Sequence, residues 1–122
     1  MGKKILLVDD SSTVLMLERM ILSQGRYELS TARDGVEGVQ RARADRPDLI
    51  LLDVVMPQMN GLDALAAIRA DQTTQHIPVI MVTTRSEVDC MESGFARGCN
   101  DYVTKPVDSA ELLAKVRNLL GE

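Results

Sequence analysis

The sequence predicts an α/β fold in which helices cover both faces of a parallel sheet. Five short apolar runs lie along the 122 residues, and each is followed by a stretch whose apolar residues have helical spacing. Short apolar runs that alternate with helices are typical of strands buried in a parallel sheet. Polar residues also follow four of the runs, and such sheets bind ligands at the edge where their strands end.

The first strand is expected at residues 4–9, and the helix after it is expected to end near Gln24. Ser11 or Ser12 can cap the start of this helix, because either hydroxyl can accept a hydrogen bond from a free N–H of the first turn. Gly25 can end it. Three apolar residues at helical spacing form its expected buried face: Val14, Leu17 and Ile21.

The second strand, residues 27–32, alternates between apolar and polar residues, so one of its faces is expected to be less buried. Asp34-Gly35 turns into a helix over about 36–44, which Arg46-Pro47 ends. Residues 48–53 form the most apolar strand. The third helix begins near residue 62, and its inward-facing residues are expected to be Leu62, Leu65 and Ile68.

The fourth strand is expected at residues 77–83, with a helix from about 86 to 96 behind it. The last strand follows at residues 100–104. Asp108 then caps the final helix, and Glu111 at the third helical position completes a capping box. The buried face of this helix is expected to consist of Leu112, Val116 and Leu119.

These five strand–helix units predict one domain over residues 1–122. Right-handed crossovers between parallel strands give a doubly wound sheet, a three-layer sandwich with helices on both faces. For a chain this short, the flavodoxin-like strand order 2-1-3-4-5 is the economical choice. In that order the first and third strands are neighbours, so topology alone brings Asp9, Asp10 and Asp53 together.

Composition and charge exclude several classes of protein. The net charge is −4 and the basic residues are dispersed, so no positive stripe favours direct binding of nucleic acid. No apolar run is long enough to cross a membrane. The two cysteines, Cys90 and Cys99, and the lack of a secretory segment predict reduced thiols in a cytoplasmic protein.

The expected pocket combines acids with groups that bind anions. Three carboxylates repel one another unless a cation is present, and Mg²⁺, or Mn²⁺, prefers such oxygen ligands. Asp10 and Asp53 are the first choices as direct ligands, with Asp9 acting directly or through water. Lys105 and the Thr83 hydroxyl can hold an anion above the metal, which points to a phosphoryl group. Asp53 is the candidate nucleophile.

Taken in order, these motifs resemble the receiver domain of bacterial two-component response regulators. The resemblance covers essentially the whole chain and is strongest to single-domain regulators of the chemotaxis type. Four motifs carry it: Asp9-Asp10-Ser11, Asp53-Val54-Val55-Met56-Pro57 with Gly61 beyond it, Thr83 thirty residues after Asp53, and Lys105-Pro106.

The resemblance implies that Asp53 accepts a phosphoryl group from a phosphohistidine on a sensor kinase or a phosphotransfer protein. It implies that Mg²⁺ is bound by the aspartates together with the backbone carbonyl of Val55. Thr83 and Lys105 would hold the phosphoryl oxygens. The resemblance also implies a cis peptide bond between Lys105 and Pro106.

Three further positions take roles from the same resemblance. Tyr102 stands where the family has a switch aromatic, which would couple the site to the surface of the fourth helix, fifth strand and fifth helix. Val55 and Arg85 stand where the family tunes the access of water to the acyl phosphate. Val55 has no polar group to orient that water, so slow dephosphorylation is expected.

The expected protein is a signalling switch that binds a protein partner in chemotaxis, motility or a phosphorelay, as a monomer or weak dimer, and not a turnover enzyme. A receiver domain from a larger regulator or hybrid kinase is the alternative within the family. A haloacid dehalogenase-like phosphatase would need an aspartate where Val55 stands. A flavodoxin-like cofactor binder would need a Gly- and hydroxyl-rich loop after the first strand, where this chain has acids.

Overall fold

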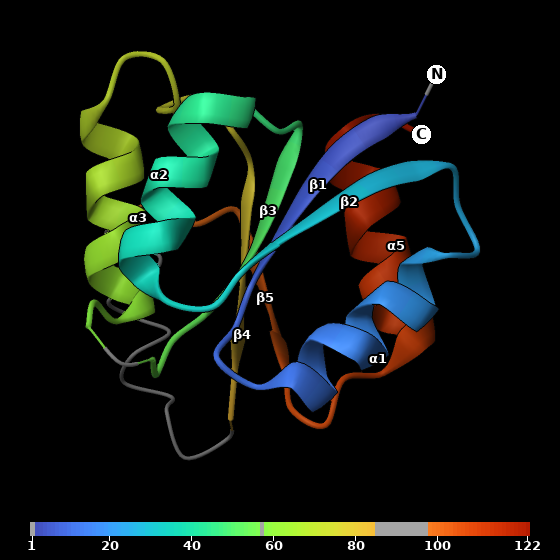
Figure 1. The fold of residues 1–122 in the computed structure, drawn as a ribbon. Coiled ribbons are helices and arrows are strands. Elements are labelled where there is room, and N and C mark those ends of the chain that lie inside the picture. Colours follow the sequence, from blue (N-terminus) through green and yellow to red (C-terminus); the bar gives the residue numbers. More distant parts are fainter. Residues whose placement is uncertain (1, 57, 85–97) are drawn as a thin grey trace.

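The five strands of the protein form one parallel sheet with the order β2-β1-β3-β4-β5, which confirms the predicted fold class and strand order (Figure 1). The computed structural model describes residues 2–56, 58–84 and 98–122. The expected helix at 86–96, Arg85 and Cys90 lie outside the described residues. The strands are β1 (Lys3–Val8), β2 (Tyr27–Ala32), β3 (Leu49–Asp53), β4 (Val79–Thr83) and β5 (Asp101–Thr104).

The described helices lie on both faces of this sheet. They are α1 (Ser12–Leu22), α2 (Gly35–Asp45), α3 (Gly61–Ala70) and α5 (Ser109–Leu120). Helices α2 and α3 cover one face, and α1 and α5 cover the other (Figure 1). None of the helices in the described part of the chain is long and apolar enough to cross a membrane.

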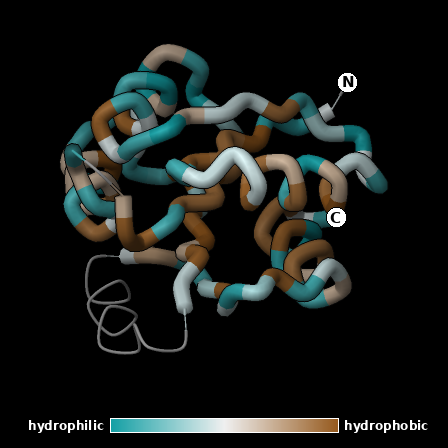
Figure 2. Tube along the Cα trace, turned by 60° about the horizontal axis from the view of Figure 1, so that its bottom comes forward, coloured by the Kyte–Doolittle hydropathy of each residue, from teal (hydrophilic) through white to brown (hydrophobic). Residues whose placement is uncertain are grey.

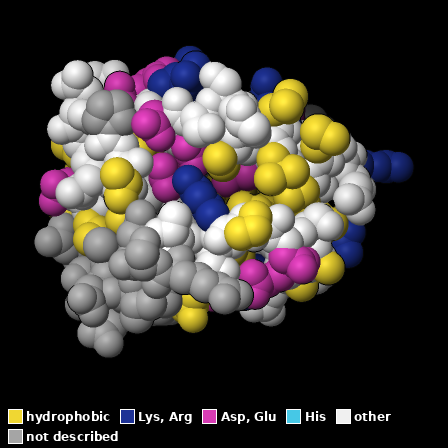
Figure 3. All heavy atoms as spheres, turned by 90° about the horizontal axis from the view of Figure 1, so that it is seen from below, with side chains coloured by type: hydrophobic (Ala, Val, Ile, Leu, Met, Phe, Trp, Pro, Cys, Tyr) yellow, Lys and Arg dark blue, Asp and Glu magenta, His cyan; other side chains and the backbone are white. Residues whose placement is uncertain are grey.

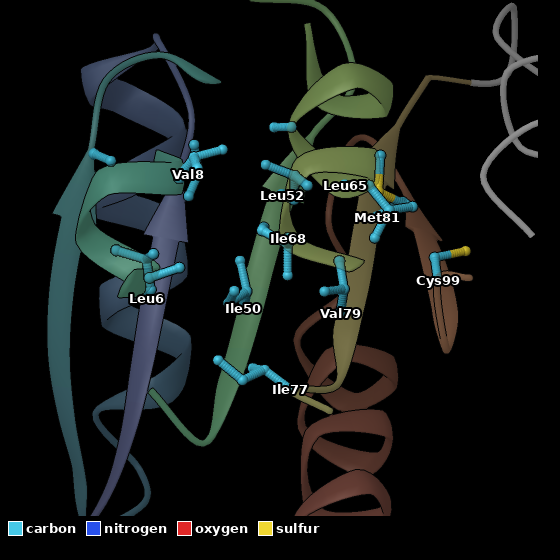
Figure 4. Packing of buried hydrophobic residues seen from close by; sticks show 14 of the residues in the cluster. Leu6, Val8, Ile50, Leu52, Leu65, Ile68, Ile77, Val79, Met81 and Cys99 are labelled. Atoms are coloured by element: carbon cyan, nitrogen blue, oxygen red, sulfur yellow. The ribbon is translucent and has the colours of Figure 1, made fainter. Parts of the chain in front are cut away.

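The core has two halves, one on each side of the sheet. In β1, Leu6 and Val8 point toward α2 and α3 whereas Ile5 and Leu7 point toward α1 and α5. Figure 4 shows the first half, in which Leu65 and Ile68 of α3 pack against the central strands. All five residues of β3 are buried, so the hydrophobic segments in Figure 2 converge on the middle of the molecule. Burial on both faces explains why the strands appear in the sequence as uninterrupted apolar runs.

Polar side chains cap the helices, and the caps of α1 and α5 are at the expected places. Ser11 accepts a hydrogen bond from the Val14 N–H at the start of α1, and Asp108 accepts one from the Glu111 N–H at the start of α5. Asn60 caps α3 in the same way. These caps satisfy N–H groups that have no partner within the helix, so each helix begins at a defined residue.

The expected buried face of α1 was wrong. Leu17 is exposed and Val14 is only half-buried, whereas the residues of α1 that are buried are Leu15, Glu18, Ile21 and Leu22. Apolar residues surround most of this helix, so their spacing does not select one face, and packing against the sheet and α5 decides instead. The helix also ends at Leu22, before Gln24, with Ser23 as its C-cap.

The fourth strand begins two residues later than expected, at Val79. Pro78 has no N–H to donate to a neighbouring strand, although its carbonyl oxygen accepts a hydrogen bond from the Ile50 N–H at 3.0 Å. Ile77 is still buried, but its N–H donates to the carbonyl oxygen of Thr74 in a turn. The apolar run at 77–83 therefore predicted burial correctly and overestimated the length of the strand.

Candidate functional site

Parallel pairing brings the ends of four strands to one edge of the sheet. Val8 pairs with Leu52 across β1 and β3, and Thr83 pairs with Thr104 across β4 and β5. The residues that end or follow these strands are Asp9, Asp10, Asp53, Thr83 and Lys105. Seen from this edge, acidic side chains surround a basic one near the centre of the surface (Figure 3).

The three aspartates form one cluster. Asp9, Asp10 and Asp53 each offer a carboxylate oxygen, and these atoms lie within 4.8 Å of one another. Asp9 and Asp53 are buried, whereas Asp10 is exposed at the mouth of the site. The arrangement therefore places two carboxylates out of water and one within reach of it.

The backbone fixes the two buried carboxylates. The Asp9 N–H donates to the carbonyl oxygen of Ala32, and the Asp9 Oδ1 accepts from the Ser11 N–H at 2.9 Å. The Asp53 Oδ1 accepts from the N–H of the next residue at 3.0 Å. Gly61 lies against this strand end, where a Cβ would overlap the Asp53 carbonyl oxygen. Only glycine permits this close approach of the two backbones.

Lys105 joins the cluster as its counter-charge. Its Nζ lies 3.0 Å from Asp53 Oδ1 and 3.3 Å from Asp9 Oδ2. Its backbone N–H donates to the carbonyl oxygen of Thr83 at 2.6 Å, which ties the end of β5 to the end of β4. The peptide bond between Lys105 and Pro106 is cis, as the resemblance implied. Burial lowers the pKa of Lys105, but the Asp53 and Asp9 carboxylates outweigh it, and the net shift is upward.

The electrostatics of the cluster favour a bound cation. Burial raises the pKa of Asp53 to about 6, the charges of Asp9 and Asp10 add to this shift, and Lys105 opposes it. The buried Asp9 Oδ2 has the Lys105 ammonium at 3.3 Å as its counter-charge but accepts no well-formed hydrogen bond in the described part of the protein. A hard divalent cation would relieve the repulsion among the three carboxylates, which one lysine does not neutralise, so the donor set fits Mg²⁺.

Thr83 and Tyr102 lie beside the cluster. Thr83 is fully buried at the end of β4, and its hydroxyl donates to the carbonyl oxygen of Thr84 at 3.3 Å. Tyr102 is half-buried on β5, where the Lys115 Nζ lies 5.2 Å from its ring centre and donates to its carbonyl oxygen at 2.6 Å. Val55 follows β3 with its side chain exposed. Lys115 thus reaches Tyr102 from α5, whereas the Tyr102 side chain packs against the core half on the α2 and α3 side of the sheet.

Two residues near the site were missed by the sequence reasoning. Glu18 points inward from α1 and is only 1% exposed, and its Oε1 has no partner among the described residues. Burial raises its pKa to about 8, and the charge of Asp9 contributes to the shift. Arg33 follows β2, and its Nη2 donates to the carbonyl oxygen of Asp10 at 3.1 Å. The position of Glu18 three residues after Leu15 was the available signal for its burial.

Comparison with known proteins points to one family. The family described as the response regulator receiver domain matches residues 5–117. Protein PilH of Pseudomonas aeruginosa is 38% identical over 97% of this chain and 98% of its own length. Response regulator PleD of Caulobacter vibrioides is 40% identical over 98% of this chain, which spans only 26% of PleD.

Solved structures agree with these relatives. The receiver domain of the sensor histidine kinase PA1611 from Pseudomonas aeruginosa, solved with a magnesium ion in its active site cleft, is 30% identical with a TM-score of 0.91, and the match covers both chains completely. The chemotaxis protein CheY4 of Vibrio cholerae is 31% identical with a TM-score of 0.89, and the match covers 98% of this chain and 99% of CheY4.

Proposed function

Because the chain belongs to the response regulator receiver domain family, we propose that it is a phosphorylation-activated switch whose phosphoacceptor is Asp53. Receiver domains are signalling switches of two-component systems rather than turnover enzymes, and they bind Mg²⁺ at an acidic pocket. The observation that carries the proposal is the placement of the Lys105 Nζ against Asp53 and Asp9 inside a cluster of three carboxylates. Such a site holds a cation and an anion together.

In the proposed reaction an Asp53 oxygen attacks the phosphorus of a phosphohistidine on a kinase or phosphotransfer protein. A P–O bond forms as the P–N bond breaks, and the electron pair of that bond stays on the imidazole, which takes up a proton. Lys105 and the Thr83 hydroxyl bind the transferred phosphoryl oxygens. Mg²⁺, held by the three aspartates and the Val55 carbonyl, would supply further neutralising charge.

The proposed output is a change at the surface of β5, α5 and the fourth helix that the sequence predicts. The phosphoryl group adds roughly 1.5 to 2 negative charges and new acceptor oxygens. These draw the Thr83 hydroxyl toward the site and open space for Tyr102 to move. To invert a 1:99 population, phosphorylation and the partner together must favour the active state by about 5.5 kcal/mol.

Val55 and Arg85 are proposed to set the lifetime of this state. The exposed Val55 side chain offers no polar group to orient a hydrolytic water, so the acyl phosphate should decay slowly. Val55→Asn should accelerate the decay, which can be followed by intact mass after the phosphodonor is removed. An unchanged or slower decay in the variant would contradict this role.

We place the protein in the cytoplasm, as one domain over residues 1–122 that exchanges phosphate with a histidine kinase or phosphotransfer protein and binds a downstream protein. The proposed role is in motility, chemotaxis or a phosphorelay, and the likeness to the chemotaxis protein CheY4 supports chemotaxis among these. The likeness to one quarter of PleD supports the alternative that the domain works within a larger regulator.

The phosphoacceptor can be tested by incubating the protein with Mg²⁺ and phosphoramidate and measuring its intact mass. We expect a phosphate-sized gain in the parent that Asp53→Asn abolishes. Asp45→Asn, at the end of α2 and outside the cluster, is the matched control and should keep the gain. A gain that persists in Asp53→Asn, or no gain in the parent, would refute the assignment.

A further inference from the structure

The first turn of α2 lies against the loop between β3 and α3, which carries one of the proposed Mg²⁺ ligands. This ligand is the backbone carbonyl of Val55, two residues beyond Asp53. Gly35, the first residue of α2, is buried, and a Cβ at its position would overlap the carbonyl oxygen of Met59 in the loop. The backbone of the helix and the backbone of the loop are therefore in direct contact.

Two further contacts hold the same loop. Met56 is buried in the core half on the α2 and α3 side of the sheet, and the half-buried Met59 packs against that half. At the base of the loop, the Gly61 N–H donates to the carbonyl oxygen of Val54 at 2.7 Å. Val55 lies between these attachments with its side chain exposed. The position of its carbonyl therefore depends on how its neighbours in the loop are held.

Hydrogen bonds fix the start of α2, so this turn offers the loop a defined surface. Asp34 Oδ1 accepts from the Glu37 N–H, and Glu37 Oε1 accepts from the Arg33 N–H, both at 2.8 Å. The Arg33 Nη2 also donates to the carbonyl oxygen of Asp10, another proposed Mg²⁺ ligand. The start of α2 and the residue before its cap thus contact both loops that carry proposed ligands of the metal.

We propose that Gly35 is a positioning residue for Mg²⁺, because its missing side chain lets the Met59 backbone lie where the Val55 carbonyl can bind the ion. This role rests on the proposed function, which assigns the three aspartates and the Val55 carbonyl to the metal. Mg²⁺ requires nearly ideal octahedral geometry, with ligands at about 2.0–2.1 Å. A small shift of the loop is therefore enough to weaken binding, although Gly35 itself does not touch the ion.

Gly35→Ala tests this role, because the new Cβ meets backbone atoms that no side-chain rotation can move away. Mg²⁺ is titrated into the parent and the variant by calorimetry, without a phosphodonor, at a temperature where both are folded. We expect the Kd for Mg²⁺ to increase about tenfold, as for other residues that orient metal ligands. Gly38→Ala is the matched control on the same helix. Its Cβ would meet the Val8 side chain at 3.0 Å and not the loop, so the Kd should stay parental.

Two further measurements separate positioning from a general loss of structure. Ca²⁺ accepts longer and more variable ligand distances than Mg²⁺, about 2.3–2.6 Å, so Gly35→Ala should weaken Mg²⁺ binding more than Ca²⁺ binding. A partly unfolded protein would lose affinity for both ions equally. In labelling by phosphoramidate, the variant should need about tenfold more Mg²⁺ for its half-maximal rate and should approach the parental rate at saturating Mg²⁺.

Met59→Ala keeps the proposal testable if Gly35→Ala does not fold. It introduces no overlap at Gly35 and removes the side chain that packs the loop against the core. The Kd for Mg²⁺ should again increase, and again by more than the Kd for Ca²⁺.

The outcomes distinguish this role from the proposed function. A parental Kd for Mg²⁺ in Gly35→Ala, or in Met59→Ala where only that variant folds, would overturn the positioning role. An equal loss of Mg²⁺ and Ca²⁺ binding, an equal loss in Gly38→Ala, or a parent that binds no Mg²⁺ would overturn it as well. A parent that binds Mg²⁺ but is not labelled by phosphoramidate would instead refute the phosphoacceptor, and the ion titrations would still decide the role of Gly35.

Discussion

Replacing Glu18 by Gln should make the protein more stable at neutral pH, and the gain should depend on pH. Glu18 is buried on the inner face of α1, its Oε1 is unpartnered within the described structure, and burial raises its pKa from 4.5 to about 8. The Glu18 carboxyl is ionised in the unfolded chain at neutral pH. When the chain folds, it must therefore either take up a proton or lose its hydrating water while charged. Gln has the same shape and carries no charge in either state.

The pKa shift fixes the sign and size of the effect. Between pH 4.5 and 8 the folded protein binds more protons than the unfolded chain, so the free energy of unfolding of the parent falls as pH rises. The slope for one group is about 1.4 kcal/mol per pH unit. The difference in free energy of unfolding between Glu18→Gln and the parent should therefore grow by about 3 kcal/mol from pH 4.5 to pH 7. Above pH 8 it should become constant, at about 5 kcal/mol more than at low pH.

Urea unfolding of both proteins at several pH values from 4.5 to 8.5 measures this difference. EDTA is included because a divalent cation at the aspartates would change the field at Glu18. Only the change of the difference with pH is interpreted, since the new amide also alters hydrogen bonding at every pH. Glu28→Gln, on the exposed side of β2, is the control and should give a flat difference. A flat difference in Glu18→Gln as well would refute the reasoning.

Three further predictions concern the acidic cluster and its frame. Gly61→Ala should lower the unfolding midpoint and slow phosphorylation by phosphoramidate, because the new Cβ would displace the Asp53 backbone; a variant with parental values for both would contradict this. Asn60→Ala removes the N-cap of α3 and should cost about 1 kcal/mol of stability in urea unfolding, with transfer to Asp53 nearly unchanged. Mg²⁺ should raise the thermal midpoint of the parent, and Asp10→Asn should weaken this binding by about tenfold. Equal Mg²⁺ titrations for the two proteins would exclude Asp10 as a ligand.

The strands and the edge of the sheet could be predicted because two simple rules agree there. Burial on both faces makes each central strand an apolar run, and parallel pairing then places residues such as Asp9, Asp53 and Lys105 at one edge, whatever the details of packing. Helix caps such as Ser11 were also predictable, since the hydroxyl acts within one turn of its own helix. These features depend on local sequence or on topology.

The features that were missed depend on how elements pack against one another. The face of α1 is chosen by contacts with the sheet and α5, so Leu17, which was expected to be buried, is exposed and Glu18 is buried. The bond from Arg33 to the Asp10 carbonyl joins residues 23 positions apart, with α1 and β2 between them in the chain. No local rule of sequence contains either contact.

The packing of α1 indicates that this helix is not arranged for stability alone. Its inner face buries the acid Glu18, while Met16, Leu17 and Met20 remain exposed. An arrangement selected for stability would bury apolar groups and expose the acid, and departures from it are expected where a surface has another use. The exposed apolar residues lie on the helix that follows Asp9 and Asp10, beside the acidic cluster. The stability lost by burying Glu18 and the exposure of the apolar residues on the outer face are therefore two consequences of one helix orientation.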